Sequence, residues 1–219
     1  MKLTVVAFLL LASVGTQAFA QPSGKDVVVP ERGQVNPLSL PQQLTEINKT
    51  FTYHGVPIHP RAVQDLTSWL SDGEPGPVAI NVEMSLNSNR YYGGYAISET
   101  HDVFIEFKKQ LFRSEGWFSY RHLGRLANGL HVLQTSDNGG GKGIFENLLL
   151  VECTIDYEFQ SDGARRELLV MQRRGEFSLG DRYSGQIKLE SKENTIVIGP
   201  CPRNGGEQRR IKLPAAKQP

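Results

Sequence analysis

The stretch LLVECTIDYEFQ, residues 149 to 160, alternates between apolar and polar side chains over its whole length. The apolar side chains stand at the odd positions, which are Leu149, Val151, Cys153, Ile155, Tyr157 and Phe159. Successive side chains of a β-strand point to opposite faces of a sheet, so a period of two indicates a strand with one buried face. A helix would instead place Glu152 in the middle of its apolar stripe. This stretch therefore predicts a long strand in a β-rich domain.

The residues after this strand predict a hairpin. The pair Asp162-Gly163 suits a two-residue turn, in which both central residues need positive φ. Counting back from such a turn pairs Tyr157 with Leu168, so that apolar meets apolar. It also pairs Glu152 with Arg173, so that acid meets base. We expect both pairs in the sheet.

Alternation of period two recurs from residue 77 onward. It marks segments near 78–84, 91–98, 103–107, 117–122, 129–135, 182–190 and 195–199. About nine strands joined by mostly short connections predict a mainly β fold, either a single antiparallel β-sandwich (jelly-roll-like) or an up-and-down barrel. The uneven lengths of the connections favour the sandwich. Residues 41–51 and 59–73 predict a short two-helix N-terminal preface, because each has a proline at its first turn.

The first twenty residues, MKLTVVAFLLLASVGTQAFA, have the three-part pattern of a secretory signal peptide. Their apolar run is shorter than the roughly 20 residues that a membrane helix needs. We expect cleavage after Ala20, export to the periplasm or the extracellular space, and no membrane span. Residues 21–40 predict an extended lead-in, residues 41–201 a single β-rich domain, and residues 202–219 a basic flexible tail.

The chain carries 24 basic and 23 acidic residues, and loss of Lys2 with the signal peptide would make the numbers equal. A protein without net charge has no overall field that attracts nucleic acid, so no nucleic-acid partner is expected. The basic tail has two interpretations. It is either solvated or in salt-sensitive contact with an anionic polymer of the cell envelope.

The chain has two cysteines, Cys153 and Cys201. An isolated pair in an exported protein predicts one disulfide. Closing a loop of about 49 residues would stabilise the fold by roughly 4 kcal/mol. A metal or catalytic role is disfavoured, since neither a close CxxC spacing nor an adjacent histidine is present.

The segment SDNGGGKG, residues 136–143, resembles a phosphate-binding loop in composition. Such a loop needs a helix after it and a hydroxyl residue after its lysine. Here Lys142 precedes Gly143, and the chain continues as a strand. We therefore expect a long hairpin loop.

Three carboxylates, Glu152, Asp156 and Glu158, share the polar face of the long strand, with Glu167 across the hairpin. Alternate residues stand roughly 6.6–6.8 Å apart, in the range where two carboxyl groups act on a glycosidic bond. The sequence TIDYE (154–158) is similar to the alternating-acid motif of some jelly-roll glycanases, although Thr154 stands where that motif has its nucleophile. Ion pairing with the arginines of residues 165–174 is the simpler explanation. The five histidines show no ligand spacing, so neither a metal nor a cofactor is expected.

Two aromatic clusters, NSNRYYGGYAIS (87–98) and GWFSYRH (116–122), are the remaining candidates. Strand neighbours face opposite ways, so one ring of each adjacent pair must lie outside the main core or under the N-terminal helices. Exposed rings beside asparagine and arginine stack on sugars or anchor protein partners. The predicted ligand-binding residues are Asn89, Arg90, Tyr91, Tyr92 and Trp117. The function we expect is an exported, non-enzymatic binding protein for a glycan, an envelope component or a protein partner. A carboxylate-dependent glycan-acting enzyme, hydrolase or lyase, is the alternative.

Overall fold

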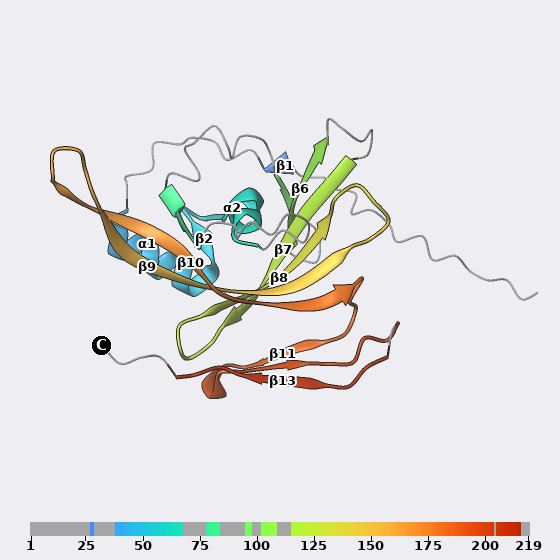
Figure 1. Cartoon of the computed structure of the whole chain (residues 1–219). Coiled ribbons are helices and arrows are strands. Elements are labelled where there is room, and N and C mark those ends of the chain that lie inside the picture. The colour runs from blue at the N-terminus through green and yellow to red at the C-terminus, as the bar shows by residue number, and fades with distance from the viewer. Residues whose placement is uncertain are drawn as a thin grey trace, which may run out of the picture.

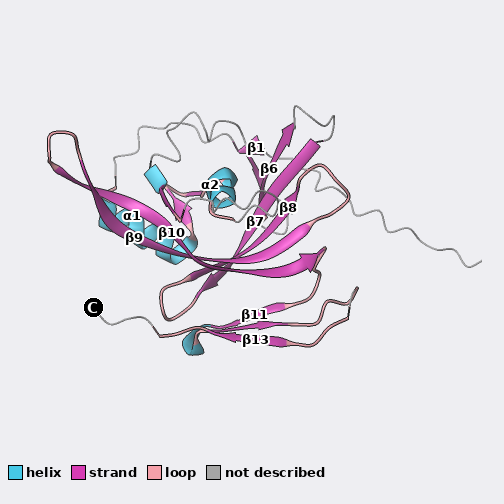
Figure 2. Cartoon of the chain, in the orientation of Figure 1, coloured by secondary structure: helices cyan, strands magenta, loops and turns pink. Residues whose placement is uncertain are grey.

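A computed structural model describes residues 27–28, 38–67, 78–83, 95–97, 102–108, 115–203 and 205–215 of the chain. This part is mainly β, as the sequence predicts, with two helices near the N-terminus and three sheets (Figures 1 and 2). The helices are α1 (Leu40–Thr50) and α2 (Pro60–Asp65), and a 3-10 turn, η2, spans Ser191–Glu193.

The largest sheet has eight strands in the order β1-β5-β6-β7-β8-β9-β10-β4. Their bounds are β1 Val27–Val28, β4 Ala79–Asn81, β5 Tyr95–Ile97, β6 Val103–Lys108, β7 Glu115–Arg125, β8 His131–Asn138, β9 Phe145–Phe159 and β10 Arg165–Asp181. Every neighbouring pair is antiparallel, and β5 to β10 follow one another as a meander. The sheet is open, with β1 and β4 at its two ends among the described strands, so it is not a closed barrel.

A second sheet packs against one face of the large sheet, which gives a sandwich-like arrangement (Figure 1). It contains β11 (Ile187–Glu190), β12 (Thr195–Ile198) and β13 (Arg209–Lys212), in that order. The third sheet is the small hairpin of β2 (Thr52–Tyr53) and β3 (Val56–Pro57). The helices lie on the opposite face of the large sheet from β11–β13 (Figure 1).

Both predicted helices are confirmed, and local signals begin each one. The Gln42 side chain accepts a hydrogen bond from the backbone N–H of Ser39 at the start of α1. At the start of α2, His59 Nδ1 accepts one from the backbone N–H of Arg61, and Pro60 occupies the first helical position. The second helix is shorter than predicted, because α2 ends at Asp65 and residues 66–67 form a turn and a bend, while residues 68–73 lie outside the described residues.

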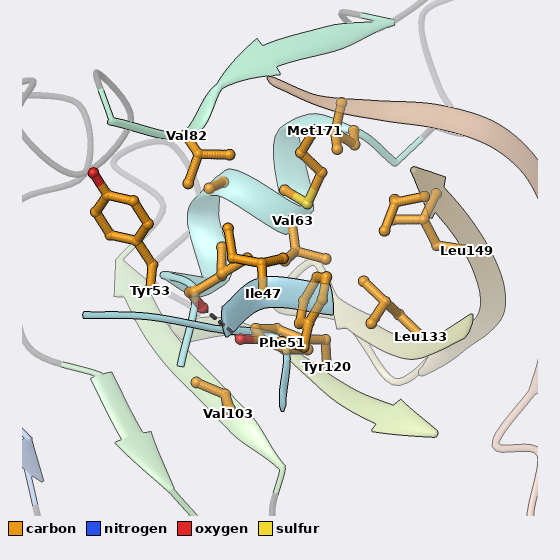
Figure 3. Packing of buried hydrophobic residues seen from close by; sticks show 14 of the residues in the cluster. Ile47, Phe51, Tyr53, Val63, Val82, Val103, Tyr120, Leu133, Leu149 and Met171 are labelled. Atoms are coloured by element: carbon orange, nitrogen blue, oxygen red, sulfur yellow. Dashed lines mark hydrogen bonds between the residues drawn. The ribbon is translucent and has the colours of Figure 1, made fainter. Parts of the chain in front are cut away.

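Two hydrophobic cores lie on the two faces of the large sheet. The helix-side core, shown in Figure 3, includes Ile47, Phe51, Val63, Phe118, Tyr120, Leu133, Leu149, Val151 and Met171. The core under the small sheet includes Val132, Leu148, Leu150, Ile196 and Ile198. This explains the unbroken apolar run at residues 148–151, because that part of β9 is covered on both faces.

The hairpin between β9 and β10 differs from its prediction by one residue. Tyr157 pairs with Glu167 and Glu152 with Gln172, so the predicted register is wrong. The reason is the turn: the Gln160 N–H donates to the Ala164 carbonyl, which closes a three-residue loop with Gly163 at φ +82°. Such a loop contains a residue more than the expected two-residue turn and therefore shifts every pair.

The predicted disulfide is also wrong, since Cys153 and Cys201 are both buried thiols that form no disulfide. Cys153 belongs to the helix-side core, whereas Cys201 belongs to the core under the small sheet. The large sheet therefore separates the two sulfur atoms. Burial raises the pKa of the Cys153 thiol to about 12, so it stays protonated and unreactive.

Part of the predicted flexible tail is ordered structure. Residues 209–212 form β13, which pairs with β12 along its whole length. Residues 216–219 lie outside the described residues, as do the predicted signal peptide and most of the lead-in. In the described part of the chain, no helix is long and apolar enough to cross a membrane.

Candidate functional site

Trp117, on β7, is the one predicted ligand-binding residue that the structure describes. Asn89, Arg90, Tyr91 and Tyr92 lie outside the described residues. The neighbouring Phe118 is fully buried in the helix-side core, so the Trp117 indole belongs to the opposite face, where it is half-buried. The prediction that only one ring of this pair enters the main core is confirmed. The helices α1 and α2 pack on the Phe118 side and leave the Trp117 side uncovered by them.

Strand register places polar residues around Trp117 on the same face of the sheet. Trp117 is opposite Asn138, Arg121 is opposite Gln134, and Ser136 lies between Ser119 and Glu146. Asp102, which precedes β6, reaches Arg121. We call this set the Trp117 face and define it as Asp102, Trp117, Arg121, Gln134, Ser136 and Glu146. It lies beyond Leu148, the nearest residue of β9 in the core under the small sheet.

Glu146 is the most deeply buried acid of the Trp117 face, with 8% of its surface exposed. Its Oε2 accepts a hydrogen bond from Ser136 Oγ at 2.8 Å and one from Gln134 Nε2 at 3.2 Å. Burial nevertheless raises the pKa of Glu146 above its ordinary value, because desolvation disfavours the carboxylate more than these hydrogen bonds favour it. Glu146 is therefore easier to protonate than a solvated glutamate.

The second acid of the face, Asp102, is held by Arg121. The guanidinium donates from Nε to Oδ1 and from Nη2 to Oδ2, both at 2.8 Å, which is the bidentate geometry of a strong ion pair. This pairing raises the pKa of Arg121 and fixes its plane. The other three N–H donors of the guanidinium make no hydrogen bond to a described residue. Since the Arg121 side chain is 39% exposed, these donors can bond to water or to a polar ligand.

The carboxylates that the sequence singles out do not join this site. Glu152 accepts a hydrogen bond from Arg174 Nε at 2.6 Å, which confirms ion pairing for this residue. Asp156 Oδ1 accepts from the backbone N–H of Tyr157 at 2.8 Å. Glu152 stands six residues along β9 from Glu146, or about 20 Å at the strand rise. Register places Glu106 of β6 directly opposite Trp117. The other acids that the structure brings to this face are Asp102 and Glu146, which sequence spacing does not reveal.

Two histidines without ligand spacing in the sequence meet in the structure. His131 Nδ1 lies 3.1 Å from His122 Nε2, and His131 Nε2 lies 3.2 Å from Asn48 Oδ1 of α1. The Phe51 ring packs against both imidazoles at centroid distances of 5.0 and 5.1 Å. Burial lowers the pKa of both histidines, to about 3 for His131. Because the pair joins α1 to the sheet and packs against Phe51 in the helix-side core, we treat it as part of the packing there.

The glycine-rich segment is a hairpin connection, as predicted. It joins β8 to β9, and the Gly140 N–H donates to Asn138 Oδ1 at 2.7 Å. A strand follows it directly, so no helix N-terminus is offered to a phosphate. Because Asn138 pairs with Trp117, the loop starts at the edge of the Trp117 face.

Tyr157 and Phe159 form an aromatic pair that the sequence places in the core. Their ring centroids are 5.7 Å apart, and the two residues are 46% and 72% exposed near the tip of the β9–β10 hairpin. The parity of the strand is correct, but these two positions lie beyond the elements that cover it. The Arg165 guanidinium stacks over Tyr157 at 3.6 Å from the ring centroid.

Comparisons with protein-family models, with curated proteins and with solved structures find no match to this chain. The Trp117 face combines a half-buried indole, a fixed guanidinium with spare donors, and two carboxyl groups in different environments.

Proposed function

We propose that the chain is an exported binding protein that recognises a glycan through the Trp117 face. The observation that carries the proposal is the position of a half-buried indole on the same sheet face as the Arg121–Asp102 fork and Glu146. A sugar ring presents an apolar face and a rim of hydroxyl groups. An indole packs against the apolar face, while charged and amide side chains pair with hydroxyl groups.

The fixed groups of the site favour a glycan over a protein or another envelope component. Arg121 is held by Asp102, and Glu146 by Ser136 and Gln134, so ligand binding orders few side chains. Preorganised donors and acceptors reduce the entropy cost of binding a small polar ligand. The face supplies both donors and acceptors, as sugar hydroxyls require.

The test is a glycan-array and envelope-polysaccharide binding screen with the purified chain and with Trp117→Ala. We expect this substitution to weaken binding roughly tenfold or more, because it removes a stacking contact worth about 1 kcal/mol together with its buried apolar area. Phe159→Ala is the matched control, since it removes an exposed ring at the hairpin tip and should leave binding unchanged. Glu158→Gln should also change little. Equal retention of the hit glycan by Trp117→Ala and the unmodified chain would refute the proposal.

A second candidate is a glycan-acting enzyme that uses Glu146 and Asp102. The raised pKa of Glu146 favours it, because a carboxyl group that keeps its proton to higher pH is better suited to act as a general acid towards a glycosidic oxygen. Asp102 would be the accompanying carboxylate.

Release of reducing ends from the bound glycan distinguishes the two candidates. Under the binding proposal no release occurs, and Glu146→Gln keeps the glycan bound. A measured release that falls at least a hundredfold in Glu146→Gln, with the circular dichroism spectrum unchanged, would establish the enzyme instead.

A further inference from the structure

The charges of this chain are balanced overall but unevenly distributed. Residues 182–215, which follow β10 and contain the small sheet, hold seven basic and three acidic residues. Residues 152–167, around the tip of the β9–β10 hairpin, hold five acidic and two basic residues. A near-zero net charge therefore conceals a basic region and an acidic region. Local potentials of this kind act on charged partners although the whole molecule has no net field.

Strand register sorts the charges of the small sheet onto one face. Ile196 and Ile198 point into the core under the large sheet. The alternate residues must then face away from it. Across the sheet, Lys188 and Arg210 lie in one row on either side of Val197, and Lys212 lies in the next row with Thr195 and Glu190. Figure 1 shows that β13 and its neighbours form the outer layer of the molecule on this side.

Two of the three cations on this outer face are not held in an ion pair with a described residue. Lys188, Arg210 and Lys212 are all exposed. Glu190 accepts a hydrogen bond from the Arg210 guanidinium, whereas neither lysine has an ion pair with a described residue. The backbones of β11 and β13 are about 9–10 Å apart across the sheet. The Cα atoms of Arg210 and Lys212 are about 6.7 Å apart along β13. The three cations thus share one exposed face of the small sheet.

We propose that the outer face of β11–β13 is a second binding surface, which takes an anionic polysaccharide by charge complementarity. The face carries no aromatic side chain, since its members are Lys188, Glu190, Thr195, Val197, Arg210 and Lys212. Single-stranded nucleic acid is held by aromatic stacking as well as by charge, so this face favours a polysaccharide over a nucleic acid. The surface lies on separate strands from the Trp117 face and is independent of the proposed function.

The test uses the purified full chain and polygalacturonate as the anionic probe, with binding measured at salt concentrations from 25 to 300 mM. Neutral dextran of similar size and single-stranded DNA are the comparison ligands. We expect binding to polygalacturonate alone, weakening steeply with salt because exposed charges are screened. The double substitution Lys188→Gln and Lys212→Gln should weaken it on the order of tenfold, at a few-fold for each exposed charge.

The controls separate this surface from the rest of the molecule. Lys49→Gln and Lys142→Gln together remove two exposed charges from α1 and the β8–β9 loop and should leave the affinity unchanged. Phe159→Ala, at the hairpin tip, should also leave it unchanged. The lysine variants leave the Trp117 face intact, so failure of the glycan proposal does not imply failure of this one. Three results would overturn the inference: no binding at 25 mM salt, equal losses in the two double variants, or DNA bound as tightly as polygalacturonate.

Discussion

At the scale of single residues, Gly185 shows how close packing limits the sequence. A Cβ atom at this position would lie 2.6 Å from the carbonyl oxygen of Pro200 and even closer to the hydroxyl of Tyr183. That hydroxyl donates to the Gly199 carbonyl at 2.9 Å, so neither neighbour can move freely. Overpacking at such a site costs about 1–3 kcal/mol. We therefore expect Gly185→Ala to lower the free energy of unfolding by that amount in urea denaturation.

The matched control for this prediction is Gly141→Ala. A Cβ atom at Gly141 would meet no described heavy atom within 4 Å, and its φ is not positive. The free energy of unfolding should then change by less than about 0.5 kcal/mol, as for other surface substitutions. Equal free energies of unfolding for the two variants would contradict the prediction, because they would show that the backbone and Tyr183 move apart without a cost in stability. The sequence alone does not predict this packing constraint, because the glycine in SGQ (184–186) is typical of any turn.

At the scale of elements, alternation of side chains predicts strands well and their pairing poorly. The long strand β9 and both helices are found from periodicity and proline positions, since these signals are local. The β9–β10 register is missed because one extra residue in the loop closed by Gln160 and Ala164 shifts every pair. The His122–His131 contact is missed because it joins the neighbouring strands β7 and β8, whose pairing the sequence does not predict.

In the candidate site, too, local features are predictable from the sequence and contacts between strands are not. Successive side chains of a strand point to opposite faces of the sheet, so the buried Phe118 leaves Trp117 outside the main core. Glu146, Arg121 and Asp102 come from three different strands or loops, and only the assembled sheet brings them together. The disulfide prediction fails at this scale as well. The sequence contains no signal for the face of the sheet on which Cys201 packs.

At the scale of the whole molecule, the buried histidine pair links helix α1 to the sheet and makes stability depend on pH. His131 is fully buried, and its pKa is lowered to about 3 by burial first and then by the neighbouring His122 and Arg125. In the unfolded chain a histidine titrates near 6.5. The unfolded state therefore binds the proton more readily. The contribution of neutral His131 to the stability of the fold is complete above pH 6.5 and is lost as pH falls towards 3.

We expect the free energy of unfolding to fall by about 2–3 kcal/mol between pH 6.5 and 4.5 from His131 alone, at about 1.4 kcal/mol per pH unit. Glu146 opposes this, because its raised pKa makes the folded state bind a proton more readily in acid. Urea titrations from pH 7.5 to 4.5 measure the sum, and His131→Asn should flatten the curve even where it lowers stability at pH 7.5. Imidazole nitrogen shifts in NMR spectra give an independent reading, in which His131 stays neutral at pH 5. A protonated His131 in the folded chain at that pH would contradict the prediction, because its neighbours Phe51, His122 and Asn48 carry no negative charge that would balance an imidazolium.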